Sequence, residues 1–327
     1  MSIPKTVDEA LHLYIDEVGK SRAPSTVRTY GYIVGKFRDT LLANDCPPEE
    51  TTLTEMSNDW IHWFLDDLRH LSPTTERGYI APILGFYEYV VAKNWLIFNL
   101  TETRYFVKRR QRKLPKRTQQ LPHQQIKAVL NLLDQRITGS FEHERNKLAA
   151  LRDRALFHLL ADSGLRISEA CSRRRGHVDW EERLIFVVGK GNKEALVRIS
   201  ERVATRLKRY LDARQQLDGL QGVKHLATLP LFARHDRRIS NQILSISPRA
   251  VQKNLEALNK QLPSELLHEI TPHTFRHYFV TTVLRRTGGD IEVAKRLARH
   301  ADISTTMRYA HLSDDELDRK YDKIFNL

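Results

Sequence analysis

Cysteine and long apolar runs are nearly absent from this 327-residue chain. Its two cysteines, Cys46 and Cys171, are far apart and belong to no CxxC or Cys/His ligand spacing. Neither a disulfide framework nor a zinc site is indicated. No apolar run approaches the roughly 20 residues of a membrane-spanning helix, and the N-terminal segment is acidic and amphipathic, unlike a signal peptide. We expect a cytoplasmic protein.

Clustered metal ligands are lacking as well. The sequence has no DxD, HExxH or similar grouping, and its acidic residues fall mainly on helix faces or beside lysine and arginine. We therefore expect no metal and no other cofactor.

Negative charge is the scarcer sign. Lysine and arginine number 53 against 40 aspartate and glutamate residues, a formal net charge of +13. Such an excess indicates a polyanionic partner, and nucleic acid is the first candidate. A membrane surface is the weaker one, and we expect no membrane partner.

The length favours two domains. Up to about residue 107 the apolar spacing is helical, with helix starts near Pro24 or Ser25, at Ser57 and at Ser72-Pro73. This part is predicted to be a module of four or five helices. The stretch from Arg104 to Arg117, RYFVKRRQRKLPKR, has eight basic residues and no acidic one.

Because it repels itself, this basic run is predicted to be an extended linker, centred on residues 108–120, that orders on an anion. A merely solvated linker is the alternative. If the run meets DNA, phosphate neutralisation would involve Lys108, Arg109, Arg110, Arg112 and Lys113.

Beyond residue 121 the pattern is mixed. Two short β-type runs, Arg183–Val188 and Ala195–Ile199, flank a glycine turn that carries Lys190. The predicted fold class is mainly α with two domains, the second holding a small antiparallel sheet. Its predicted helices are His123–Leu133, Leu148–Ala161, Glu201–Leu217, Arg249–Gln261, His273–Arg286 and Ile291–Ala298.

Two arginines and a tyrosine suit phosphodiester cleavage without metal. Negative charge that builds on a phosphate is neutralised either by divalent metals or by fixed guanidinium and imidazole donors. Arg166 follows a predicted glycine C-cap, and Arg276 lies three residues after His273 on one face near a helix start. Tyr309 offers a phenolic nucleophile.

Each of these residues also has an interpretation without a catalytic role. Arg166 would be an ordinary salt-bridging residue, Lys190 a solvated turn residue and Tyr309 a core aromatic. His273, Arg276 and His300 would be helix-surface groups. Their joint occurrence in five specific local contexts favours the functional interpretation.

Those contexts are SGLRISE, VVGKGNKE, TPHTFRHYF, ARHADIS and TTMRYAHLS. On them, the chain resembles the tyrosine recombinases of the phage integrase family, with a layout similar to the bacterial Xer recombinases. The resemblance implies a SAM-like core-binding domain over residues 1–107, a catalytic domain over residues 121–312 and a protomer-exchange helix over residues 313–327. The family's catalytic set falls on Arg166, Lys190, His273, Arg276, His300 and Tyr309, and its supporting acidic residue on Glu169.

The resemblance also implies roles. Tyr309 attacks the phosphate to form a 3′-phosphotyrosyl link, Lys190 protonates the leaving 5′-oxygen, and His273 assists proton transfer from the tyrosine. Arg166, Arg276 and His300 hold the phosphate oxygens. Exchange between double-stranded DNA sites then passes through a Holliday junction in a homotetramer. The spacing of Ser313 and Glu316 predicts a capping box at the start of the protomer-exchange helix.

Some features depart from the family pattern. Arg299 stands where the family usually has glycine, so its backbone must avoid the left-handed region or tolerate a non-glycine residue there. The segment Gln135–Asn146 is long and Leu220–Arg238 is irregular and basic; either could be a loop that touches DNA. We expect no arm-binding domain before the helical module, unlike in the large phage integrases.

Two other functions stay open: a type IB topoisomerase that relaxes DNA, and a non-catalytic DNA-binding protein on the same scaffold. A covalent protein–DNA adduct that is lost in Tyr309→Phe separates an enzyme from a binding protein. The target sequence, a heteromeric recombinase partner and the task, whether dimer resolution, integration, excision, transposition or inversion, do not follow from these residues.

Overall fold

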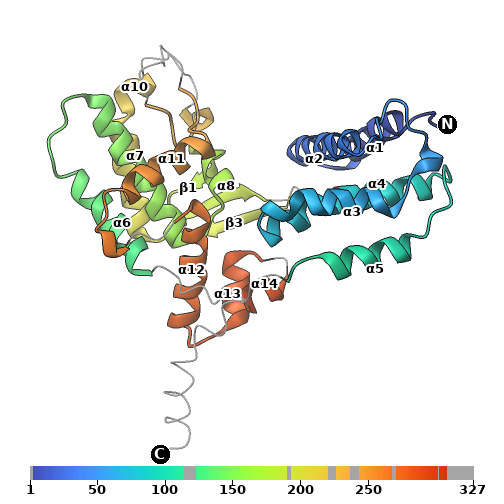
Figure 1. The fold of residues 1–327 in the computed structure, drawn as a ribbon. Helices are drawn as coiled ribbons and strands as arrows, with labels where there is room; N and C mark the ends of the chain where they lie inside the picture. Colours follow the sequence, from blue (N-terminus) through green and yellow to red (C-terminus); the bar gives the residue numbers. More distant parts are fainter. Residues whose placement is uncertain are drawn as a thin grey trace, which may run out of the picture. The chain divides into compact units, whose positions relative to one another are not determined.

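The protein divides into two compact units, Met1–Thr118 and Gln119–Leu327, seen in a computed structural model (Figure 1). Each unit has its own hydrophobic core. The structure describes residues 3–113, 123–189, 193–219, 226–235, 243–266, 270–300 and 302–307.

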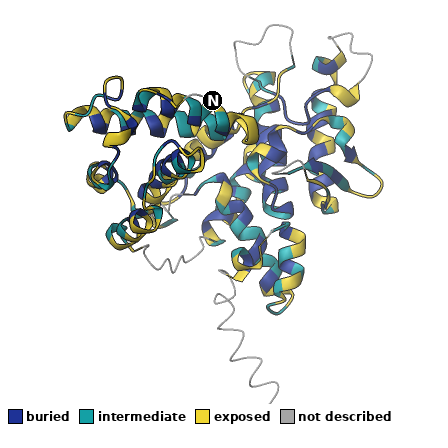
Figure 2. Cartoon of the chain, turned by 90° about the vertical axis from the view of Figure 1, so that its right-hand side faces the viewer, coloured by how far each residue is buried: buried dark blue, intermediate teal, exposed yellow. Residues whose placement is uncertain are grey.

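The described part of the first unit is helical. Helices α3 and α4 begin where the sequence predicted, because the hydroxyls of Ser57 and Ser72 accept hydrogen bonds from backbone N–H groups of the first turns. Buried residues face inward and exposed ones face solvent along each helix (Figure 2). The helices are α1 (Val7–Ser21), α2 (Pro24–Ala43), α3 (Asn58–Asp67), α4 (Pro73–Ala92) and α5 (Leu100–Arg110), with 3₁₀ turns at Leu53–Glu55 and Leu68–His70.

Helix α1 is hydrogen-bonded to α4 at a proline within α4. The Tyr14 hydroxyl donates a hydrogen bond of 2.9 Å to the carbonyl of Pro82. A Cβ at Gly85 would lie 2.5 Å from that hydroxyl, so only glycine admits this approach. Burial raises the pKa of Tyr14. A polar contact thereby fixes two helices within an aromatic core.

The prediction of an extended basic linker is wrong for residues 104–110, because α5 continues through Arg110. Three basic residues end the helix, where they interact favourably with its dipole. Repulsion is also reduced by distant acidic partners: Arg104 pairs with Glu88 at 2.6 Å and Arg110 with Asp66 at 3.1 Å. Residues 114–122 lie outside the described part of the chain.

The second unit combines helices with a small antiparallel sheet, which confirms the predicted fold class. The strands β1 (Val178–Asp179), β2 (Leu184–Val188) and β3 (Glu194–Arg198) pair in that order, with Ile185 opposite both Val178 and Val197. The helices are α6 (His123–Arg136), α7 (Glu144–Ser163), α8 (Ile167–Cys171), α9 (Glu201–Ala213), α10 (Gln215–Gly219), α11 (Pro248–Asn259), α12 (Pro272–Arg286), α13 (Ile291–Ala298) and α14 (Ile303–Met307). Short 3₁₀ turns span Arg175–His177, Leu226–Thr228 and Ser264–Leu266.

Two loop expectations can be compared with the structure. Helices α6 and α7 leave residues 137–143 as the connection within the long segment Gln135–Asn146. Within Leu220–Arg238, residues 226–235 are described, and Leu231 and Phe232 are fully buried. Residues 229–233 therefore belong to the core, whereas residues 226–228 are exposed.

Helix α7 is the centre of this unit, packing against α6, α9 and α12. Leu156, Phe157 and Leu160 are fully buried, and Phe157 stacks at a tilt on Phe275 of α12 with 5.3 Å between ring centroids. Neighbours on several sides make α7 a firm support for the turn at its C-terminus.

Candidate active site

The turn after α7 requires glycine. Gly164 has φ 61° and ψ 19°, the left-handed conformation of a helix C-cap, and its N–H donates to the Leu160 carbonyl at 3.1 Å. A Cβ at this position would lie 2.4 Å from Cδ1 of Phe279. Gly164 thus turns the chain and leaves room for α12. The buried Leu165 follows, and then the exposed Arg166.

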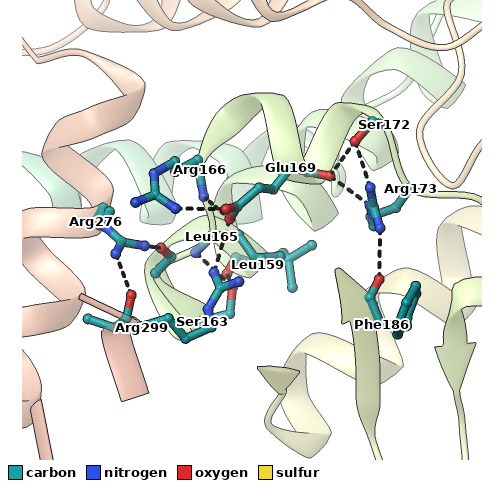
Figure 3. A network of polar contacts seen from close by, with 12 residues as sticks. Leu159, Ser163, Leu165, Arg166, Glu169, Ser172, Arg173, Phe186, Arg276 and Arg299 are labelled. Carbon is teal, nitrogen blue, oxygen red and sulfur yellow. Dashed lines mark hydrogen bonds and ion pairs between the residues drawn. The ribbon is translucent and has the colours of Figure 1, made fainter. Parts of the chain in front are cut away.

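Arg166 precedes α8 and is bound to Glu169 in the first turn of that helix. Its backbone N–H donates to Glu169 Oε2 at 2.9 Å, and its Nη1 donates to Oε1 at 2.8 Å. The Glu169 side chain is 6% exposed, whereas that of Arg166 is 43% exposed. A buried carboxylate therefore orients a guanidinium that remains accessible (Figure 3).

A second guanidinium reaches the same carboxylate. Arg299 follows the last turn of α13, and its Nη2 lies 3.0 Å from Glu169 Oε2. Its backbone has φ 56° and ψ 46°, so the chain tolerates a non-glycine residue in the left-handed region. Glu169 lies between two arginines that come from distant parts of the sequence.

These contacts set the charge state of Glu169. Burial opposes its ionisation, but the backbone N–H of Arg166 and the charges of Arg299 and Arg166 outweigh burial and lower the pKa of the carboxyl below its ordinary value. Glu169 is thus a carboxylate at neutral pH.

Arg276 joins the glycine turn to the end of α13. It is 3% exposed, and its Nη1 donates to the Gly164 carbonyl at 2.6 Å. Its Nη2 donates to the carbonyl of Ala298, the residue before Arg299. Figure 3 shows this guanidinium beside the Arg166–Glu169 pair. Because two carbonyls fix its plane, Arg276 is oriented before any ligand arrives.

The two histidines occupy different helix ends. His273 is exposed in the first turn of α12, after Thr271 and Pro272, and its ring meets that of His277 edge-on with 4.4 Å between centroids. His300 follows Arg299; its Nδ1 and the hydroxyl oxygen of the buried Thr306 are hydrogen-bonded at 2.8 Å. This contact connects His300 to α14.

Lys190 and Tyr309 lie outside the described residues. The chain before Lys190 reaches the site, because a Cβ at Gly189 would lie 3.6 Å from Glu169 Oε1. Arg173 holds that region in place: its Nε donates to the Glu169 carbonyl and its Nη1 to the Phe186 carbonyl of β2, both at 3.0 Å.

Of the residues predicted for the site, the described contacts connect Arg166 with Glu169, and Arg276 with the segment that carries His300. His273 shares α12 with Arg276 and lies three residues before it. The sequence analysis missed Arg173 and Thr306 as supports. For Thr306, a signal was its place in the motif TTMRYAHLS, three residues before Tyr309.

The basic residues predicted to meet DNA differ in their contacts. Arg112 binds Glu76, a fully buried carboxylate, through Nε at 2.8 Å and Nη2 at 2.7 Å. Arg110 binds Asp66. Both guanidiniums therefore also form ion pairs within the first unit. Lys108, Arg109 and Lys113 are exposed, and Arg109 donates to the hydroxyl of Tyr105 at 2.8 Å.

Across the described residues, no group of three or more histidine, cysteine, aspartate or glutamate side chains is placed to hold a metal ion. In the same part of the chain, no helix is long and apolar enough to cross a membrane.

Comparison with known proteins gives matches along most of the chain. Residues 105–316 match the phage integrase family. The chain is 30% identical over 321 residues to the tyrosine recombinase XerC of Myxococcus xanthus, covering 94% of this chain and 93% of that protein. It is 37% identical over 182 residues to the tyrosine recombinase XerD of Lacticaseibacillus casei, covering 55% of this chain and 57% of that protein.

Solved structures share the fold at low sequence identity. The recombinase XerH bound to a palindromic difH substrate aligns with a TM-score of 0.64 at 17% identity, over 98% of this chain and 91% of that one. A lambda integrase dimer bound to a COC′ core site aligns with a TM-score of 0.63 at 13% identity, over 92% of this chain and 97% of that one.

Proposed function

Since this chain belongs to the phage integrase family and is a site-specific tyrosine recombinase, an enzyme that cleaves and rejoins DNA, we propose that Tyr309 is its nucleophile and that Arg166 and Arg276 hold the scissile phosphate. The observation that carries this proposal is the bond from Arg276 Nη1 to the Gly164 carbonyl, 2.6 Å long. This bond holds the buried Arg276 guanidinium against Gly164, which lies two residues before Arg166 in the sequence.

Paired guanidiniums suit this task because each presents a planar, permanently charged fork to phosphate oxygens. Arg276 is fixed by carbonyls and Arg166 by Glu169, so little reorganisation is needed as charge develops. His300, oriented through Thr306, supplies a third donor to the phosphate.

The reaction conserves phosphodiester bonds. The Tyr309 oxygen attacks phosphorus and the bond to the 5′-oxygen breaks, which leaves a 3′-phosphotyrosyl link and a 5′-hydroxyl. His273 assists removal of the tyrosine proton, and Lys190 donates a proton to the leaving 5′-oxygen. A 5′-hydroxyl of a second strand then reverses the step, so no ATP is needed, and the guanidinium and imidazole donors take the place of a metal ion.

Double-stranded DNA is the proposed partner. The net charge of +13 supports it, and XerH and lambda integrase are both seen with DNA. Within the second unit, a hollow of about 690 Å³ lined by Arg249, Lys253 and His273 lies between α11 and the start of α12. Lys108, Arg109 and Lys113, which are exposed, would contact the backbone from the first unit together with Arg110 and Arg112.

We assign residues 1–110, through the end of α5, to core binding, residues 111–120 to a connection and residues 121–312 to catalysis. Residues 313–327 would pack into a neighbouring protomer of a synaptic homotetramer, with exchange through a Holliday junction. Deletion of residues 314–327 should abolish cooperative synapsis and leave the folding of the monomer unchanged.

The test is covalent capture on nicked suicide duplexes with a randomised core, in which cleavage releases a short fragment and blocks religation. The wild-type protein should give a covalent adduct that survives denaturation, and Tyr309→Phe should give none. Tyr32→Phe, at an exposed tyrosine of the first unit, is the matched control and should retain the adduct. Absence of adduct from the wild-type protein would overturn the proposal.

The captured sequences supply a probe for the reaction class. Two copies on one plasmid should give resolved or inverted product. Relaxation of supercoils without exchange would instead identify a topoisomerase.

A further inference from the structure

Arg299 combines an unfavourable backbone with a shielded ion pair. The other non-glycine residues with positive φ in the described part of the chain are Asp45, Asn94 and Arg183. Asp and Asn tolerate this conformation better than most residues. The Arg183 side chain is 44% exposed, whereas that of Arg299 is 18% exposed.

The ion pair changes the charge balance around Arg166. Glu169 Oε2 accepts from the Arg166 backbone at 2.9 Å and from Arg299 Nη2 at 3.0 Å, while Oε1 accepts from Arg166 Nη1 at 2.8 Å. Two guanidiniums and one carboxylate leave one positive charge. Without Arg299, Arg166 and Glu169 would sum to zero.

We propose that Arg299 is a positioning residue that binds the Glu169 carboxylate, so that Arg166 is oriented and its positive charge remains for the phosphate. The same contact ties the C-terminal end of α13 to the first turn of α8. This inference rests on the proposed function of Arg166.

A purely structural role of Arg299 would give a different experimental result. Glycine accepts the left-handed backbone of residue 299 without strain, so Arg299→Gly removes the ion pair and relieves the backbone together. If Arg299 served only to hold the fold, stability and activity would fall in parallel. If it positions Glu169, activity falls while the unfolding midpoint stays constant or rises.

The experiment measures single-turnover rates of adduct formation on the captured duplex at saturating protein. Arg299→Gly and Arg299→Met should reduce the rate roughly 10- to 100-fold, the range for losing a hydrogen bond to a charged group. Binding of the duplex should change less than threefold, because Arg299 acts through Glu169. Arg299→Lys should recover most of the rate. Arg296→Met, an exposed arginine on the same helix, is the matched control and should keep it.

A double-mutant cycle tests the route of the effect. In a Glu169→Gln background, Arg299→Gly should reduce the rate by less than threefold, because the charged partner is already gone. Equal effects in both backgrounds would overturn the inference.

The outcomes separate this inference from the proposed function. No adduct from wild-type protein refutes the nucleophile assignment. A normal wild-type adduct with an unchanged rate in Arg299→Gly refutes the role of Arg299, as does a rate loss matched by an equal loss of stability or by the Arg296→Met control.

Discussion

Gly164→Ala should be among the most damaging single-methyl additions in the second unit. An alanine with φ 61° costs roughly 1–2 kcal/mol relative to its preferred conformations. The added Cβ would also lie 2.4 Å from Phe279 Cδ1, and over-packing of this kind costs about 1–3 kcal/mol. The sum, about 2–5 kcal/mol, is a large part of the 5–15 kcal/mol typical of a domain.

Urea denaturation of the full chain, followed by a probe in the second unit, measures this cost. Gly139→Ala is the matched control, because an added Cβ there would meet only the Arg136 carbonyl, at 3.9 Å, and the φ of Gly139 is not positive. It should change stability by less than about 0.5 kcal/mol.

A cycle with Phe279→Ala separates the two contributions. With the ring absent, Gly164→Ala should cost only the backbone part, which gives a coupling of about 1–3 kcal/mol. Activity should fall as well, since the Gly164 carbonyl binds Arg276 and Arg166 follows two residues later. A cost below about 1 kcal/mol, or additive effects in the cycle, would show that this turn is not as constrained as its geometry implies.

Three further outcomes follow from contacts described above. Thr306→Val should slow adduct formation about tenfold with little change in the unfolding midpoint, because His300 loses the hydroxyl that orients it. Arg112→Met should destabilise the first unit by about 3 kcal/mol in chemical denaturation, because Glu76 stays buried without its partner; Glu76→Gln in addition should restore part of this. Burial, followed by the charge of Arg206, lowers the pKa of His158 from 6.5 to about 4. As pH falls, the unfolded chain therefore binds a proton at His158 before the folded chain does. Stability is lost between pH 6.5 and 4, by about 2 kcal/mol at pH 5. In thermal melts recorded across this pH range, His158→Gln should reduce the loss.

Local signals explain what the sequence predicted well. Ser57, Ser72 and Gly164 mark helix ends through contacts within a few residues, and those ends were predicted correctly. The part of the basic run up to Arg110 was predicted wrongly because charges in it are balanced by Glu88 and Asp66, which are distant in sequence.

The site divides in the same way. Arg166 and Glu169 are three residues apart, and their motif indicated that they act together. The Arg299–Glu169 pair spans 130 residues and depends on a left-handed backbone, which no local pattern specifies for arginine. Lys190 and Tyr309 remain predictions from motif alone.

The end of α13 has a consequence for exchanging parts between relatives. Ala298, Arg299 and His300 each contribute a different group: a carbonyl to Arg276, a guanidinium to Glu169 and an imidazole to Thr306. A substitution removes one of these contacts, but a one-residue insertion or deletion would shift all three out of register. A chimera with a related enzyme should therefore be joined in the 287–290 connection before α13 or beyond α14, and never between residues 298 and 306.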